Sequence, residues 1–149
     1  MSEKLIKQDL IKEIESLSPS DFENVCYEIL KKEFPETTIL HKGVNINDKP
    51  VKGTLDINDR QFEICLECST QMDYFTDSKY LKINNDIQHI LKLSNGKAKK
   101  VFLYCSQIEP PTFNPKWIKS EIYKLFRDIT IEIFDATKIA EKIFEYNIV

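Results

Sequence analysis

The segment KGTLDINDRQFEICLECSTQ, at residues 52–71, gathers the side chains best suited to chemistry. Its pattern predicts a hairpin of two strands, and since side chains alternate along a strand, Glu63 and Glu67 share one face of the second strand. Asp56 lies on the first strand. Carboxylates gathered in this way repel one another unless a positive charge lies among them, and Mg²⁺ or Mn²⁺ prefers oxygen ligands. A cation held here could bind a phosphodiester and activate water for in-line attack.

This pattern leaves two questions open. The glutamates could simply point into solvent from a half-exposed strand whose other face is apolar and packs on the core. The register is also open: with Asp59 and Arg60 at the centre of the turn, Asp56 lies opposite Glu63, and Glu67 lies about 13 Å further along. A bulge or a longer loop would bring Glu67 closer. Both Glu63 and Glu67 are therefore candidates for the second acid.

Other chemistries have less support. Cys65 and Cys68 form a C-x-x-C pair, but side chains three apart on a strand point to opposite faces, so we expect buried free thiols and no zinc or redox site. His89 is expected on a helix surface or end, and His41 on a first strand has no assigned role. The three glycines lack the spacing of a phosphate-binding loop.

The elements that must position these residues follow from periodicity. Apolar spacing predicts helices over 3–17, 18–34, 77–96, 114–126 and 136–147 and strands over 37–43, 51–58, 61–70, 101–105 and 129–135. Ser20 and Glu23 are spaced as a capping box for the second helix, and Asp135 precedes the last helix as its cap. The order ααβββαβαβα is typical of an α/β fold.

Composition indicates a globular protein. The 149 residues are 42% hydrophobic and 30% charged, and we expect them to form a single domain over 1–149. No apolar run is long enough for a membrane span and the first residues do not resemble a signal peptide, so we expect a cytoplasmic protein with no membrane partner. The net charge of -3 means that any contact with phosphate must be local.

Three short motifs in an αβββαβ order resemble the PD-(D/E)xK nuclease superfamily: D-F-E-N-V-C-Y-E-I-L in the leading helix, G-T-L-D at 53–56 and E-C-S-T-Q at 67–71. They are more narrowly similar to Mrr-like restriction-endonuclease domains, whose third strand ends in a V-E-[CY]-T-T-Q type motif. Such domains occur at the N-terminus of bacterial STAND/NACHT-type antiphage defence proteins. The resemblance covers about residues 20–106. It implies a restriction endonuclease-like αβββαβ core with a central mixed sheet flanked by helices, here followed by a C-terminal αβα extension.

The resemblance also implies roles for individual residues. Asp56 matches the motif aspartate, Glu67 the (D/E) position and Ser69 the position of the motif lysine. Gln71 matches the polar residue that follows. Glu23 matches the acidic residue that such nucleases often place on the first helix to complete the metal site, although a capping box would explain it equally well.

Two positions depart from the motif. Leu55 replaces a proline, and Ser69 replaces the lysine whose ammonium orients the attacking water and stabilises negative charge on the phosphate. Members of the superfamily move this lysine to a neighbouring element. Lys82, in the pattern K-I-x-x-D-I at 82–87, is the candidate, and its alternative is a solvated lysine paired with Asp86 one turn later.

Together with the resemblance, these residues predict a Mg²⁺- or Mn²⁺-dependent endonuclease that hydrolyses a nucleic acid, with double-stranded DNA the expected substrate, and that acts as a homo-oligomer. The resemblance alone implies a role as an effector of antiphage defence. Lysines on nearby loops would neutralise phosphates, namely Lys42, Lys49, Lys52, Lys97, Lys99 and Lys100. A second hypothesis is a catalytically degenerate nuclease-like module that binds nucleic acid or a protein partner, which Ser69 and the acidic net charge favour. A third is a plain interaction or dimerisation domain.

Overall fold

The described residues fold around a five-stranded mixed sheet. The structure is a computed structural model, and it describes residues 2–41, 55–116, 118 and 128–148. The strands follow the order β1-β2-β3-β4-β5, and their bounds are Ile39–His41, Ile57–Asp59, Ile64–Ser69, Lys100–Cys105 and Thr130–Phe134. The first three pair antiparallel, and β3, β4 and β5 pair parallel. The predicted α/β class is therefore confirmed.

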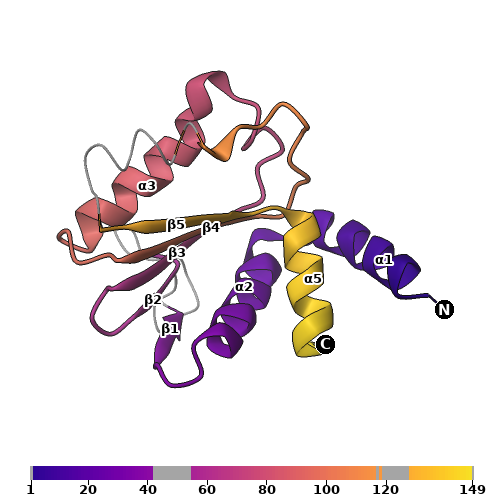
Figure 1. Cartoon of the computed structure of the whole chain (residues 1–149), viewed down its shortest axis with the longest axis horizontal. Coiled ribbons are helices and arrows are strands. Elements are labelled where there is room, and N and C mark those ends of the chain that lie inside the picture. Colours follow the sequence, from indigo (N-terminus) through magenta and orange to yellow (C-terminus); the bar gives the residue numbers. More distant parts are fainter. Residues whose placement is uncertain (1, 42–54, 117, 119–127, 149) are drawn as a thin grey trace.

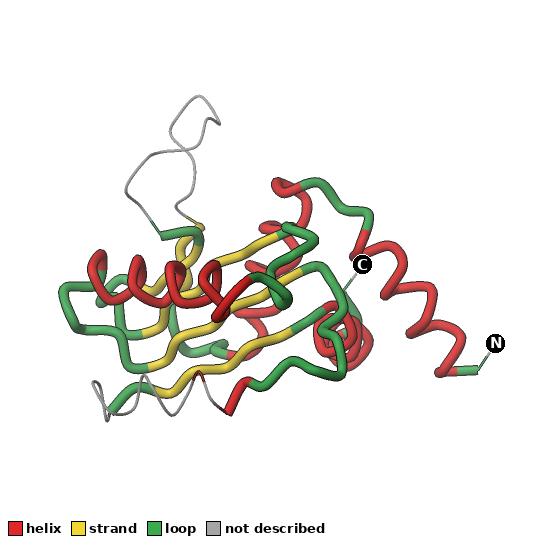
Figure 2. Tube along the Cα trace, turned by 90° about the horizontal axis from the view of Figure 1, so that it is seen from above, coloured by secondary structure: helices red, strands yellow, loops and turns green. Residues whose placement is uncertain are grey.

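Helices cover both faces of the sheet (Figure 1). Their bounds are Glu3–Glu15 for α1, Pro19–Glu33 for α2, Leu81–Leu93 for α3 and Ala136–Tyr146 for α5, with a 3₁₀ turn, η1, at Ser78–Tyr80. One face carries α3, and the other carries α2 and α5, with α1 packed beside α5 (Figure 2). The helix predicted over 114–126 is helical at 115, 116 and 118, and the rest of it lies outside the described residues.

Because of this arrangement, the sheet separates two hydrophobic cores. On the α3 side, Ile87 and Ile83 pack with Cys65, and on the other side Phe22 of α2 packs with Leu66. Neighbouring positions of β3 thus enter opposite cores. The expectation of one solvated strand face is wrong for β3, since a strand flanked by parallel neighbours and covered by helices is buried on both faces.

The N-cap of helix α2 lies two residues earlier than the sequence indicated. Ser18 is the N-cap, and its hydroxyl accepts a hydrogen bond from the Asp21 backbone N–H at 3.2 Å. Pro19 occupies the first turn, where its missing N–H costs nothing. The predicted capping box of Ser20 and Glu23 is therefore wrong, and Glu23 has no capping role that would explain its position.

The hairpin between β2 and β3 has a longer loop than predicted. Ile57 pairs with Leu66 and Asn58 with Cys65, so Asn58 and Asp59 belong to the strand and the chain reverses after them. The Asp59 carboxylate accepts hydrogen bonds from the backbone N–H groups of Glu63 at 2.8 Å and Ile64 at 3.0 Å. These two backbone amides therefore have hydrogen-bond partners without pairing between the strands. Relative to the predicted hairpin, the register is shifted by four residues, so Asp56 lies beside Glu67 and not beside Glu63.

The later elements follow the prediction more closely. β4 is buried along both faces from Val101 to Cys105, and Asp135 caps α5 by accepting from the Lys138 N–H at 3.1 Å. The helix predicted over 77–96 begins only at Leu81, after η1. Among the described residues, no helix has both the length and the apolar character needed to cross a membrane.

Candidate active site

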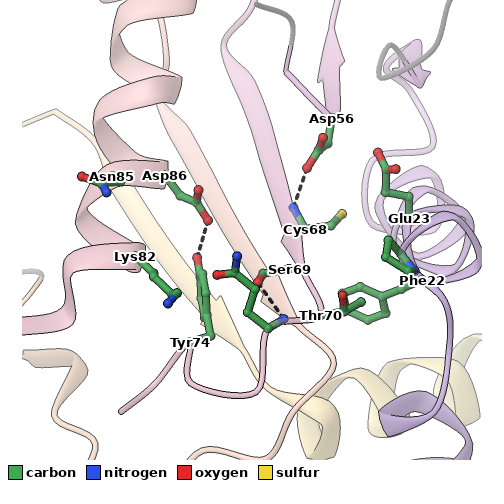
Figure 3. Close-up of a pocket in the computed structure, with 12 residues that line it drawn as sticks. Phe22, Glu23, Asp56, Cys68, Ser69, Thr70, Tyr74, Lys82, Asn85 and Asp86 are labelled. Atoms are coloured by element: carbon green, nitrogen blue, oxygen red, sulfur yellow. Dashed lines mark hydrogen bonds between the residues drawn. The ribbon is translucent and has the colours of Figure 1, made fainter. Parts of the chain in front are cut away.

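A polar pocket of about 490 Å³ opens where β3 ends, between α2 and α3 (Figure 3). Its lining combines acidic, hydroxyl and amide side chains with few apolar ones, namely Pro19, Phe22, Glu23, Asp56, Cys68, Ser69, Thr70, Gln71, Tyr74, Lys82, Asn85 and Asp86. Most of the residues that the motif resemblance singled out therefore lie in or beside one cavity.

Three carboxyl groups from different parts of the chain form a cluster here: Glu23 and Asp56 line the pocket, and Glu67 contacts Asp56. Glu23 projects from α2, and Asp56 lies immediately before β2 (Figure 3). Glu67 lies near the end of β3. Ile57 pairs with Leu66 in the antiparallel ladder. Asp56, one residue before Ile57, therefore lies beside Glu67, one residue after Leu66. Asp56 Oδ2 accepts a hydrogen bond from the Cys68 backbone N–H at 2.8 Å, which ties this carboxylate to the end of β3.

The two glutamates of the cluster have a raised pKa. Burial is the largest cause for Glu67, which is only 7% exposed, and a hydrogen bond and charge from Asp56 add to it, so the pKa of Glu67 rises to about 11. Burial, followed by the charge and hydrogen bond of Asp56, raises the pKa of Glu23 to about 7. The cluster therefore retains protons at neutral pH, where isolated carboxylates would have lost them.

A second polar group faces the cluster from α3. His89 Nδ1 lies 2.6 Å from Glu67 Oε1, and the Tyr74 hydroxyl donates to Asp86 Oδ2 at 2.7 Å. Burial raises the pKa of Asp86, and the charge of Asp56 contributes to the rise. His89 lies at the helix surface as predicted, with its side chain 41% exposed, but its contact with Glu67 was not predicted. Asp86 and His89 are three apart and share a helix face, but the pattern does not say which strand end that face meets.

His41 approaches the cluster from β1. Its Nε2 lies 3.6 Å from Glu23 Oε1, and neither atom, although buried, has a hydrogen-bond partner within the described part of the chain. The His41 ring stacks on Tyr27, with ring centroids 5.4 Å apart. The sequence contained no local signal for this pairing, because it depends on how β1 packs against α2.

Ser69, at the position of the motif lysine, and Lys82, the candidate for its replacement, both line the pocket. Ser69 Oγ accepts from the Gln71 N–H at 3.2 Å, so the serine that replaces the motif lysine helps turn the chain after β3. Lys82 lines the pocket, and its ammonium lies 2.7 Å from Asp73 Oδ2. The predicted alternative pairing of Lys82 with Asp86 is wrong, because Asp86 accepts from Tyr74 instead.

Other predicted residues lie elsewhere. Glu63 precedes β3 and pairs with Lys99 at 3.4 Å, so it is separated from Asp56 by the length of the strand. Lys97, Lys99 and Lys100 are at the start of β4, at the opposite end of the sheet from the pocket. The other three predicted phosphate contacts, Lys42, Lys49 and Lys52, lie outside the described residues.

The donor chemistry of the cluster suits a hard divalent cation, since three carboxyl groups supply oxygen ligands. In the described ranges, however, no three His, Cys, Asp or Glu side chains stand as a set that could hold an ion as they lie. Glu67 is engaged by His89, and Asp56 bonds both Glu23 and Glu67. A cation would take the place of the protons that the cluster retains. The four cysteines are free thiols, as expected.

Comparisons with protein-family models, with curated proteins and with solved structures found no significant match to this chain. The functional interpretation of the site therefore depends on its geometry, its charges and the motif resemblance.

Proposed function

We propose that this chain is a nuclease domain of the PD-(D/E)xK type that hydrolyses phosphodiester bonds with Mg²⁺ or Mn²⁺, with double-stranded DNA as its substrate. The observation that carries the proposal is the cluster of Glu23, Asp56 and Glu67: the first two line one pocket, Glu67 contacts Asp56, and the pKa of both glutamates is raised. The order of α2, β1, β2, β3, α3 and β4 around a mixed sheet agrees with a restriction endonuclease-like core.

Asp56 and Glu67 would hold the cation, with Glu23 as the third acid. When bound, such a cation polarises a phosphoryl oxygen and lowers the pKa of a water molecule. Gln71 and Ser69 lie at the same pocket edge, where amide and hydroxyl groups can hydrogen-bond phosphate oxygens. Lys82 would supply a positive charge if its ammonium exchanged Asp73 for a phosphate oxygen.

Two contacts favour a second candidate, a degenerate nuclease-like module that binds nucleic acid or a protein partner without cutting. The Ser69 hydroxyl carries no charge and is used in a turn, and the Lys82 ammonium is already paired with Asp73. Both observations concern the positive charge that stabilises the transition state. Neither removes the acidic cluster, which is why we place the enzyme first.

Nicking of supercoiled plasmid tests the proposal. Purified protein is incubated with Mg²⁺ or Mn²⁺ beside Asp56→Asn and Glu67→Gln, with Glu63→Gln as the matched control because Glu63 pairs with Lys99 outside the pocket. We expect nicking that requires the metal, is lost in the first two variants and is retained in Glu63→Gln.

Two results would contradict the proposal in different ways. Wild-type protein that binds Mn²⁺ but cuts neither DNA nor RNA supports the degenerate module. Nicking that survives in Asp56→Asn would mean that the activity comes from another site or from a contaminating nuclease. The predicted role in antiphage defence and the predicted homo-oligomer are proposals that this assay does not address.

A further inference from the structure

The contact between His89 and Glu67 assigns a role to α3 in the proposed metal site, and the inference rests on the proposed function because it concerns the same carboxyl group. His89 Nδ1 and Glu67 Oε1 are 2.6 Å apart, a short hydrogen bond. The Glu67 side chain is 8% exposed and the His89 side chain 41% exposed. The contact therefore runs from the buried end of β3 toward the surface.

Both partners stand on rigid elements. Ile87 and Ile90, on either side of His89 in α3, are fully buried in the core beneath the helix. Glu67 lies within a ladder in which β3 pairs with β4, where it is matched with Leu103. A contact whose two partners are both fixed in this way keeps its geometry. An exposed ion pair between two long flexible side chains does not.

The contact also fixes which oxygen of Glu67 is engaged. His89 takes Oε1, which leaves Oε2 outside this hydrogen bond, while Asp56 bonds the same carboxyl group from the adjacent strand. Outer partners of this kind orient the carboxylates and imidazoles that bind metals, and they are part of what sets the metal affinity.

We propose that His89 is a positioning residue for Glu67, which holds this carboxyl group in the orientation in which Glu67 and Asp56 bind Mn²⁺ or Mg²⁺. Its role is distinct from that of Lys82, which lines the pocket and faces Asp73. The imidazole acts through Glu67 and makes no contact with the reacting phosphate.

The test measures Mn²⁺ affinity by electron paramagnetic resonance on the purified full chain. His89→Ala and His89→Leu remove the hydrogen bond, and the leucine keeps most of the volume. His89→Asn keeps a donor near the position of Nδ1 and serves as the conservative variant. Gln88→Ala, at the exposed neighbouring position of α3, is the matched control. We expect Mn²⁺ binding weakened by roughly 10- to 100-fold in His89→Ala and His89→Leu. His89→Asn should stay close to wild type, and Gln88→Ala should equal it.

Plasmid nicking at saturating Mn²⁺ gives a second readout, because a positioning role predicts that kcat recovers once the weakened site is filled. His89→Ala and His89→Leu that bind Mn²⁺ as tightly as wild type would refute the inference while leaving the proposed function intact. Equal loss in His89→Asn would also overturn it, since the hydrogen bond would then not be the cause. Wild-type protein that binds no Mn²⁺ would instead refute the proposed function, and the inference with it.

Discussion

Replacing Glu23 by glutamine should stabilise the metal-free protein. Glu23 lies beside Asp56 in a partly buried position, and burial and the charge of Asp56 raise its pKa to about 7. Glutamine has the same shape but carries no charge at any pH, so Glu23→Gln removes the repulsion and keeps a polar group at the site. A residue that serves only to cap α2 would not respond in this way.

The sign and size follow from the shifted pKa. The folded protein binds the Glu23 proton more tightly than the unfolded chain, whose glutamate titrates near 4.5. Stability is therefore fully present below pH 4.5 and is lost as the pH rises toward about 7. At about 1.36 kcal/mol per pKa unit, the full loss is about 3 kcal/mol. Because the side chain is 22% exposed, solvent screening lowers our expectation to about 1–2 kcal/mol.

Urea unfolding of wild type and Glu23→Gln in EDTA, at pH 8 and at pH 5, measures the effect. We expect the variant to be more stable by about 1–2 kcal/mol at pH 8, and the difference to shrink at pH 5. Glu28→Gln, on the same helix, breaks only a surface pair with Lys31 and should change stability by no more than about 0.5 kcal/mol. A destabilised Glu23→Gln at pH 8, or a gain independent of pH, would refute the reasoning.

Three further predictions concern the metal, the lysine and a buried cap. In differential scanning fluorimetry, Mg²⁺ should raise the thermal unfolding temperature of wild type but not of Asp56→Asn. The rise should be larger at pH 8 than at pH 6, because protons compete with the cation for the same carboxyl groups. Lys82→Ala should lower the nicking rate by about 100-fold or more while the unfolding temperature stays nearly constant, since its pair with Asp73 is at the surface; unchanged nicking would exclude Lys82 from catalysis. Asp135→Ala should cost about 1–3 kcal/mol in urea unfolding, because this buried carboxylate accepts from the backbone N–H groups of Lys138 and Glu109.

Local patterns predicted the elements well because each depends on neighbours in the chain. The alternation of apolar residues places β5, and Asp135 marks the start of α5 because its carboxylate caps the helix. At α2, the capping-box spacing predicted Ser20 as the cap, whereas Ser18 caps the helix. The helix core was therefore predictable and its first residue was not.

The candidate site was predictable in its residues and only partly in its geometry. Asp56 and Glu67 were both identified, but their separation depends on a loop in which the Asp59 carboxylate bonds two backbone amides. No pattern of hydrophobic residues encodes that loop. His41 and His89 reach the cluster from elements far away in the sequence, so their contacts follow only from tertiary packing.

The sheet divides the protein into two hydrophobic cores, and the pocket draws side chains from both sides of that division. Glu23 belongs to the α2 layer and Asp86 to the α3 layer, while His89 of α3 contacts Glu67 on the strand between the layers. Local opening of either layer would separate these groups even while the other core stayed packed. Loss of cation binding on heating should thus coincide with the first cooperative unit to open, and amide hydrogen exchange in α2 and α3 would identify which layer sets the working temperature of the site.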